Sequence, residues 1–237
     1  FETHAARDIV IDLTLTHRFM HNQLAEEDKA LEPVVAWHNE PDRGYTTAKI
    51  CTWDRAGLFS KIAGSFAAAG INILNAQIFT RNDGIVLDTF YVTDARTGSL
   101  VNRGERELFE STLGRALVED ELDFRALIAR QKTARPPYQA LEGERIPTQI
   151  RIDNDTSANR TILEIETEDH VGLLHVISQA LSELNLDISL AKISTEKGAA
   201  IDTFYVCEHD GQKIVWPERQ QLIEERLRAG LTAAFGS

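Results

Sequence analysis

The stretch TTAKICTWDRAGLFSKIAGSFAAAGINILNAQIFTRNDGIVLDTFYV at 46–92 recurs, with substitutions, as TILEIETEDHVGLLHVISQALSELNLDISLAKISTEKGAAIDTFYV at 161–206. An Asp-x-x-Gly-Leu motif begins at Asp54 in the first copy and at Asp169 in the second. Both copies end in the pentapeptide DTFYV. A shared pentapeptide at matching spacing is the mark of an internal duplication. The chain therefore contains two copies of one structural unit.

Each copy opens with a strand and a helix. An apolar strand, 48–53 or 162–167, leads into the Asp-x-x-Gly turn, and apolar residues at helical spacing follow. Gly70 ends the first predicted helix, and Asn185 takes the same place in the second copy. Both residue types are favoured where a helix ends in a left-handed residue.

A hairpin and a second helix complete the pattern. Two β-rich runs follow each first helix, joined by Asn-Asp-Gly at 82–84 and by Lys-Gly at 197–198, which suit tight turns. Second helices are predicted from Arg103 to about Gln131 and from Pro217 to about Leu227. This order predicts an α+β chain of two ferredoxin-like βαββαβ domains, each with an antiparallel sheet and helices on one face.

The pattern also suggests domain limits. We expect a first domain at 46–153, with a linker at 133–147 and a closing fourth strand at 148–153, and a second domain at 154–237 without a clear fourth strand. Residues 1–45 are expected to connect the pair to a missing upstream domain, because the chain begins at Phe1 and 9–24 has helical amphipathic character. The short apolar run at 34–37 fits an additional strand.

Composition excludes several functions. The net charge is −12, with 43% hydrophobic residues, so the chain reads as globular and as a poor partner for nucleic acid or anionic membranes. No apolar run is long enough to span a membrane. Cys51 and Cys207 lie in apolar strand-like runs and predict buried thiols without a disulfide framework. Together these features favour a cytoplasmic protein.

The Asp-x-x-Gly turns are the first candidate binding sites. A glycine there lets the backbone approach a ligand, and the helix start offers unpaired N–H groups to a carboxylate. The aspartate has two interpretations, because it can cap the helix or contact an ammonium group. For a single turn, capping is the commoner role. The candidate residues are Asp54, Gly57 and Leu58 in the first copy and Asp169, Gly172 and Leu173 in the second.

The strand after each first helix supplies a second candidate. Its polar start is Asn72-Ile73 in the first copy and Asp187-Ile188 in the second, and we expect this strand end to face the same small pocket as the turn. A polar residue at a strand edge is the simpler interpretation. His17 and His21 lack a third ligand and are expected to face solvent. Asp88 and Asp202, within DTFYV, are expected to be structural, and no motif predicts a catalytic site.

These motifs also carry a family resemblance. The stretch 53–94, WDRAGLFSKIAGSFAAAGINILNAQIFTRNDGIVLDTFYVTD, resembles the first ACT domain of the bacterial PII uridylyltransferase/uridylyl-removing enzymes. The second copy, from TQIRIDNDTSANRTILEIETEDHVGLLHVISQALSELNLDISLAKIST to IDTFYV, is similar to their second ACT domain. The resemblance covers about 46–227, and the NDTS stretch and the tandem order favour this family over other ACT-bearing proteins.

The resemblance implies a regulatory role. Members of this family bind glutamine in a carboxy-terminal ACT pair that biases upstream domains, which attach UMP to the PII signalling protein or remove it. Their full-length chains use a divalent metal such as Mg²⁺. This chain shows neither the nucleotidyltransferase signature nor the HD metal constellation, so no cofactor is expected on it. Ligand contact is carried over to Asp54, Gly57, Leu58 and Asn72 and to Asp169, Gly172, Leu173 and Asp187.

Two departures and two alternatives accompany this resemblance. Ala56 and Val171 stand where the ACT turn often has proline, and Asn72 differs from its counterpart Asp187, which favours the first copy as the glutamine site. One alternative is a ligand-independent interaction module that forms a homodimer through exposed sheet edges. The other is the regulatory tail of an amino-acid biosynthetic enzyme.

Overall fold

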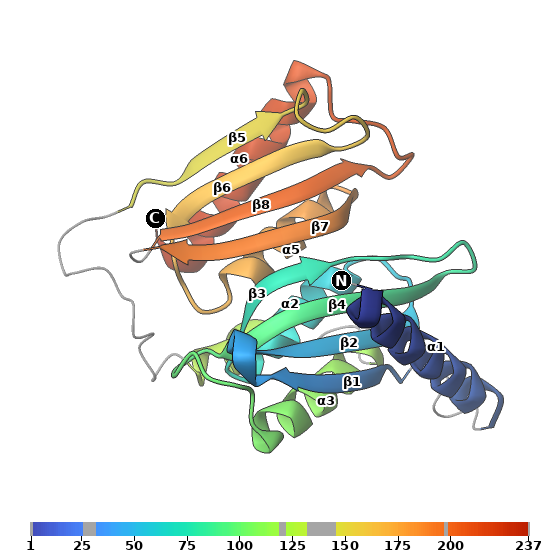
Figure 1. Cartoon of the computed structure of the whole chain (residues 1–237). Coiled ribbons are helices and arrows are strands. Elements are labelled where there is room, and N and C mark those ends of the chain that lie inside the picture. The colour runs from blue at the N-terminus through green and yellow to red at the C-terminus, as the bar shows by residue number, and fades with distance from the viewer. Residues whose placement is uncertain (1, 26–31, 119–121, 132–145, 197–198, 237) are drawn as a thin grey trace.

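The computed structural model describes residues 2–25, 32–118, 122–131, 146–196 and 199–236. Within them, eight strands form one antiparallel sheet in the order β1-β2-β4-β3-β7-β8-β6-β5. The first copy occupies one half of this sheet and the second copy the other half (Figure 1). The expected α+β fold with antiparallel strands is confirmed.

The first half contains four strands and three helices. Its strands are β1 (Val34–Glu40), β2 (Tyr45–Trp53), β3 (Ile71–Gln77) and β4 (Ile85–Asp94), and a short 3-10 turn η2 (Pro41–Arg43) joins β1 to β2. Its helices are α2 (Leu58–Ala68), α3 (Arg103–Val118) and α4 (Phe124–Ala129). The single helix predicted over 103–131 is thus two helices.

The second half repeats the plan without a counterpart of α4 among the described residues. Its strands are β5 (Gln149–Asp153), β6 (Thr161–Glu168), β7 (Leu186–Glu196) and β8 (Ala199–Glu208), and its helices are α5 (Leu173–Glu183) and α6 (Pro217–Phe235). Helix α6 extends well past the predicted end. The linker expected at 133–147 and the turn at 197–198 fall mostly or wholly outside the described residues.

The predicted position of one strand is wrong. The segment 148–153 was expected to close the first domain, but Gln149–Asp153 pairs with β6 of the second copy, from Gln149↔Glu166 to Asp153↔Ile162. Strand β1 fills the corresponding place beside β2. The physical reason is proximity, because each edge strand pairs with the strand that directly follows it through a short connection. Each repeat therefore begins one strand earlier than 46 or 161.

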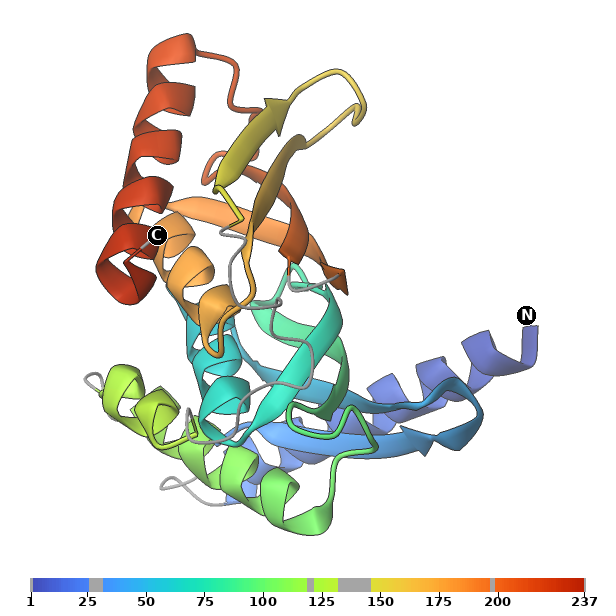
Figure 2. The ribbon, with the colours of Figure 1, turned by 90° about the vertical axis from the view of Figure 1, so that its left-hand side faces the viewer.

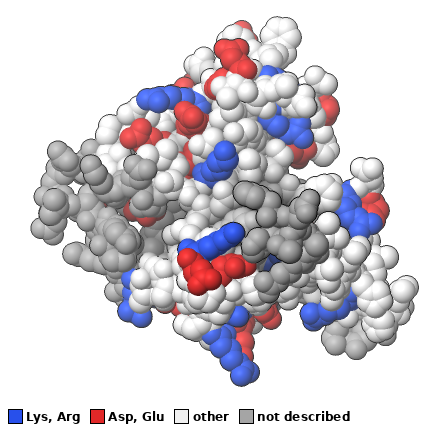
Figure 3. All heavy atoms as spheres, in the orientation of Figure 1, with Lys and Arg blue, Asp and Glu red and all other residues white. Residues whose placement is uncertain are grey.

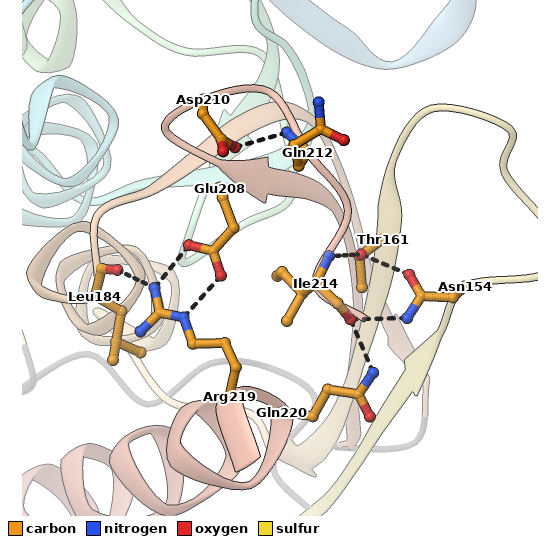
Figure 4. Close-up of polar contacts among 9 residues, drawn as sticks. All are labelled: Asn154, Thr161, Leu184, Glu208, Asp210, Gln212, Ile214, Arg219 and Gln220. Carbon is orange, nitrogen blue, oxygen red and sulfur yellow. Dashed lines mark hydrogen bonds and ion pairs between the residues drawn. The ribbon is translucent and has the colours of Figure 1, made fainter. Parts of the chain in front are cut away.

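A repeated hydrogen-bond network fixes these edge strands. In the second copy, the Asn154 amide donates to the Ile214 carbonyl at 2.8 Å and accepts from Thr161 Oγ1 at 2.7 Å, while Thr161 Oγ1 accepts from the Ile214 N–H (Figure 4). In the first copy, Thr46 Oγ1 donates to Asn39 Oδ1 at 3.0 Å and accepts from the Val101 N–H. The asparagine of the NDTS stretch is thus a structural residue that joins the edge strand to the segment before the last helix.

Helices α2, α3, α5 and α6 cover one face of the sheet, and α1 (Glu2–Ala25) lies on the opposite face of the first half (Figures 1 and 2). One apolar core runs through both halves and includes Phe66, Phe90, Ile177 and Phe204. Leu15 and Phe19 of α1 pack in a separate cluster on the other side. The shared core makes the two copies one packed unit.

Helix α1 is held by a partly buried ion pair. Lys49 Nζ lies 2.7 Å from Asp12 Oδ1, and Lys49 is only 7% exposed. His17 and His21 are exposed on this helix, as expected. On the face shown in Figure 3, basic and acidic side chains are interspersed, so the net charge of −12 does not gather there into one patch.

Candidate functional site

The two Asp-x-x-Gly turns start the two helices that join the copies. Helices α2 and α5 pack against each other, and so do strands β3 and β7, which run antiparallel with Ala76 opposite Ala191. A side chain at Gly57, at the start of α2, would place its Cβ 3.3 Å from Ser182 Oγ near the end of α5. The turn of the first copy therefore faces the second copy, not its own strand.

Both turns require glycine. Gly57 and Gly172 are the residues that precede α2 and α5, with φ angles of 70° and 87°. This left-handed conformation is costly for residues with a Cβ. The residue at each N-cap position is thus a glycine, which has no side chain to cap the helix. The first-turn N–H groups carry the partial positive charge of a helix start.

A cavity of about 670 Å³ opens at Gly57 between the two copies. Its walls come from α2, the end of α3, α4 and α5. The polar groups around it belong to hydroxyl, amide, cationic and anionic side chains. They are Ser60, Lys61, Asp123, Arg125, Gln179, Ser182 and Glu183. Such a mixture of opposite charges and amide groups suits a small zwitterion.

His175 of α5 lines this cavity and contacts α2. Its Nδ1 donates to the Ser60 carbonyl at 2.9 Å and lies 3.2 Å from Ser60 Oγ. Burial lowers the pKa of His175, and the bond to Ser60 opposes this shift. The imidazole is therefore neutral near pH 7. The same ring packs on Phe124 of α4, with centroids 4.9 Å apart.

The second turn has a different environment. A Cβ at Gly172 would lie 3.1 Å from both Cδ1 and Cγ2 of Ile128 in α4. Ile128 is 5% exposed, so an apolar side chain packs at Gly172 where the Ser182 hydroxyl lies at Gly57. Because α4 has no counterpart among the described residues of the second copy, the two turns have different neighbours.

The ten predicted site residues do not converge. Gly57 and Gly172 each line a cavity. Leu58, Leu173 and Ile73 are buried in the core, and Ile188 packs against it. Asp54, Asn72 and Asp187 are exposed, and Asp169 is half-buried.

The expectation that a strand start shares a pocket with its own turn is wrong. Asn72 follows the end of α2, whereas Gly57 precedes its start, so an 11-residue helix of roughly 16 Å separates them. The same holds for Asp187 and Gly172. Strand β7 runs antiparallel to β3, so the start of β7 lies at the end of the sheet where β2 enters the Gly57 turn. Each turn thus shares a sheet end with the strand start of the other copy.

Sequence reasoning missed most of the cavity. Gln179, Ser182 and Glu183 lie at spacings of three and four on α5, away from the core stripe of Ile177 and Leu181. Their polar spacing on one helix face was a visible signal. No signal in the sequence indicated that this face contacts the other copy, because that contact depends on how α2 and α5 pack.

The carboxylates of the repeated DTFYV are buried in the sheet. Asp88 and Asp202 are each 1% exposed. Burial raises the pKa of both to about 8, opposed at Asp88 by a hydrogen bond from the Phe79 N–H at 3.1 Å. Asp202 Oδ1 has no hydrogen-bond partner among the described residues.

Two further observations concern the described ranges. Cys51 and Cys207 are buried free thiols, as predicted. No group of three or more His, Cys, Asp or Glu side chains there is placed to hold a metal ion. Among the same residues, every helix is too short or too polar to cross a membrane.

Comparison with known proteins identifies both halves. A family model described as ACT domain matches residues 48–102, and one described as ACR9-like, ACT-like domain matches residues 149–235. The second match begins at the first residue of β5, in agreement with the pairing of that strand.

Three curated relatives share the printed name bifunctional uridylyltransferase/uridylyl-removing enzyme. The relative from Gluconobacter oxydans is 37% identical over 88% of this chain and 22% of its own length. Those from Azospirillum brasilense and Rhodospirillum rubrum are 36% and 33% identical, over 78% and 86% of this chain and 20% and 22% of their own lengths. The chain spans about a fifth of the length of these relatives. It therefore belongs to the ACT-domain family, as a tandem pair of ACT domains that resembles one region of the bifunctional uridylyltransferase/uridylyl-removing enzymes.

Proposed function

We propose that this chain is the amino-acid-sensing regulatory region of a bifunctional uridylyltransferase/uridylyl-removing enzyme that acts on the PII signalling protein in the cytoplasm. Glutamine is the proposed ligand, and the cavity at Gly57 is its site. One observation carries the proposal: this cavity is walled by both ACT copies and presents groups that complement each part of a polar amino acid.

The groups around the cavity suggest how glutamine lies in it. The ligand carboxylate faces the first turn of α2 and Lys61, where the helix start and the side chain are both positive. The ammonium group faces Asp123 and Glu183. The side-chain amide faces Gln179, because an amide pairs with another amide as donor and acceptor at once.

Such a ligand would regulate by bridging the copies. Contacts to α2 of the first copy and to α5 of the second stabilise the arrangement in which these helices enclose the ligand. The shift that glutamine causes in the equilibrium between the two arrangements is limited by the difference in its affinity for them.

Calorimetry on the 237-residue chain tests the proposal. Glutamine should bind, and Gly57→Val should weaken binding by at least about tenfold, because the new side chain enters the cavity next to Ser182. Gly211→Val is the matched control, since Gly211 has a similar φ of 82° but no atom within 4 Å of the added Cβ. Absence of glutamine binding at millimolar concentration would refute the proposal.

A second candidate function is dimerisation. The sheet ends in β1 on one side and β5 on the other, and edge strands offer unpaired backbone groups to another chain. A homodimer that forms through these edges regardless of ligand would support an interaction module. Sedimentation with and without glutamine separates the two functions, because the sensor requires a ligand response and the module does not.

A further inference from the structure

The two glycine turns face chemically different side chains. Gly57 faces the hydroxyl of Ser182, whereas Gly172 faces the side chain of Ile128. Beside Gly172 lies a second cavity of about 410 Å³, between α4, α5 and α6. This volume is within the range of small-molecule sites, which is roughly 300–1,000 Å³.

The walls of this second cavity are mainly apolar. They include aliphatic side chains from all three helices and the Phe235 ring at the end of α6. The principal apolar residues are Ile128, Val171, Val176, Ala180, Leu184 and Phe235. The Phe235 ring stacks on His170, with centroids 4.5 Å apart, which fixes the aromatic end of the cavity. A ligand here needs an apolar body.

The charged groups at the cavity favour an anion. Arg125 of α4 and Arg226 of α6 both line it, and within the described part of the chain neither forms an ion pair or a hydrogen bond. The lining contains one carboxylate, Glu183, which already accepts from the Gln179 amide at 3.2 Å. His175 is neutral, because burial lowers its pKa. Two cations therefore face one anion, on a chain whose net charge is −12.

We propose that the cavity beside Gly172 binds an aliphatic carboxylate, with its chain against α5 and α6 and its carboxylate between Arg125 and Arg226. Guanidinium groups pair with carboxylates through charge-assisted hydrogen bonds, which are about twice as strong as neutral ones. This cavity adjoins the one at Gly57 and shares a wall with it, formed by Arg125, His175, Gln179 and Glu183, but its other walls include α6 and it takes a different class of ligand. The proposal does not depend on the glutamine proposal.

Octanoate is a suitable probe, and calorimetry on the 237-residue chain measures its binding. Octanoate should bind, and octanamide, which lacks the charge, should bind at least about tenfold more weakly. Ala233→Trp should abolish octanoate binding, because Ala233 is an exposed residue of α6 that lines the cavity. Ala126→Trp is the matched control, since Ala126 is exposed on α4 and lines neither cavity.

A charge variant gives a second test that does not change the volume of the cavity. Arg226→Gln should weaken octanoate binding by about tenfold and leave octanamide binding unchanged. Gly57→Val should leave octanoate binding intact, which separates this site from the glutamine site. The proposal is overturned if octanoate does not bind, if Ala233→Trp and Arg226→Gln both leave its affinity unchanged, or if leucine binds there and octanoate does not.

Discussion

Replacing Asp88 or Asp202 by asparagine tests how the two buried carboxylates of DTFYV respond to pH. Each is 1% exposed on the helix-covered side of the sheet. Burial raises the pKa of each carboxyl from 3.8 to about 8, and the nearby carboxylates of Asp54 and Asp169 add to the shift. The folded protein therefore holds these protons far more tightly than the unfolded chain does.

The sign of the effect follows from this difference. A group with a raised folded pKa contributes stability that is complete below its unfolded pKa and is lost as the pH rises through its folded pKa. At 1.36 kcal/mol per pKa unit, each carboxyl contributes roughly 2–3 kcal/mol at pH 6 and almost nothing at pH 8.5. The free energy of unfolding should thus fall by about 5 kcal/mol over this interval from the two groups together.

Urea unfolding at pH 6 and pH 8.5 measures this loss. Asparagine has the shape of a protonated aspartate but cannot ionise, so Asp88→Asn and Asp202→Asn should each reduce the pH-dependent loss by about 2–3 kcal/mol. Asp155→Asn is the control, because it makes the same substitution at an exposed position. If the wild-type protein is equally stable at both pH values, the carboxyls are not buried as described and the reasoning fails.

Two further predictions concern the helices that join the copies. Gly64→Ala should lower the free energy of unfolding by about 1–3 kcal/mol, because the new Cβ would lie 2.7 Å from Phe124 and 2.9 Å from His175. Gly114 lies on α3, and a Cβ added there has no neighbouring atom within 4 Å. Gly114→Ala should therefore raise the free energy of unfolding by about 0.5–1 kcal/mol. The same sign for both variants would contradict the packing of α2 on α5. Ile128→Ala should lower the free energy of unfolding, measured in urea, by about 2–5 kcal/mol, because Ile128 is 5% exposed and packs against Gly172. A change near zero would show that α4 does not pack there.

Local signals in the sequence were sufficient for most of the fold. The repeat, the alternating strands and the glycine turns predicted the elements of each copy. Asn185 was expected to end its helix in a left-handed conformation, and it has a φ of 55°. These features depend on neighbours within a few residues, so the sequence pattern reveals them directly.

The position of the edge strand could not be read in the same way. The segment 149–153 is a plausible strand next to either copy, and only its pairing with β6 decides between them. One signal was present and overlooked. Asn39 precedes Thr46 by seven residues, as Asn154 precedes Thr161, and both pairs form the same hydrogen bond. That shared spacing would have extended each repeat by one strand.

The candidate site was predicted only in part. The glycine turns were identified, but Ser182 and Gln179 reach the Gly57 cavity from the other copy, more than 100 residues away in sequence. The difference between the two turns depends on Ile128, whose helix has no counterpart in the described part of the second copy. Contacts of this kind follow from the packing of helices, which no local pattern encodes.

A crystal structure of the chain grown at saturating glutamine tests the central claim most directly. We predict one glutamine in the cavity at Gly57, within hydrogen-bond distance of both α2 and α5. Glutamine bound within a single copy, or a Gly57 cavity that stays empty while glutamine is saturating, would contradict it.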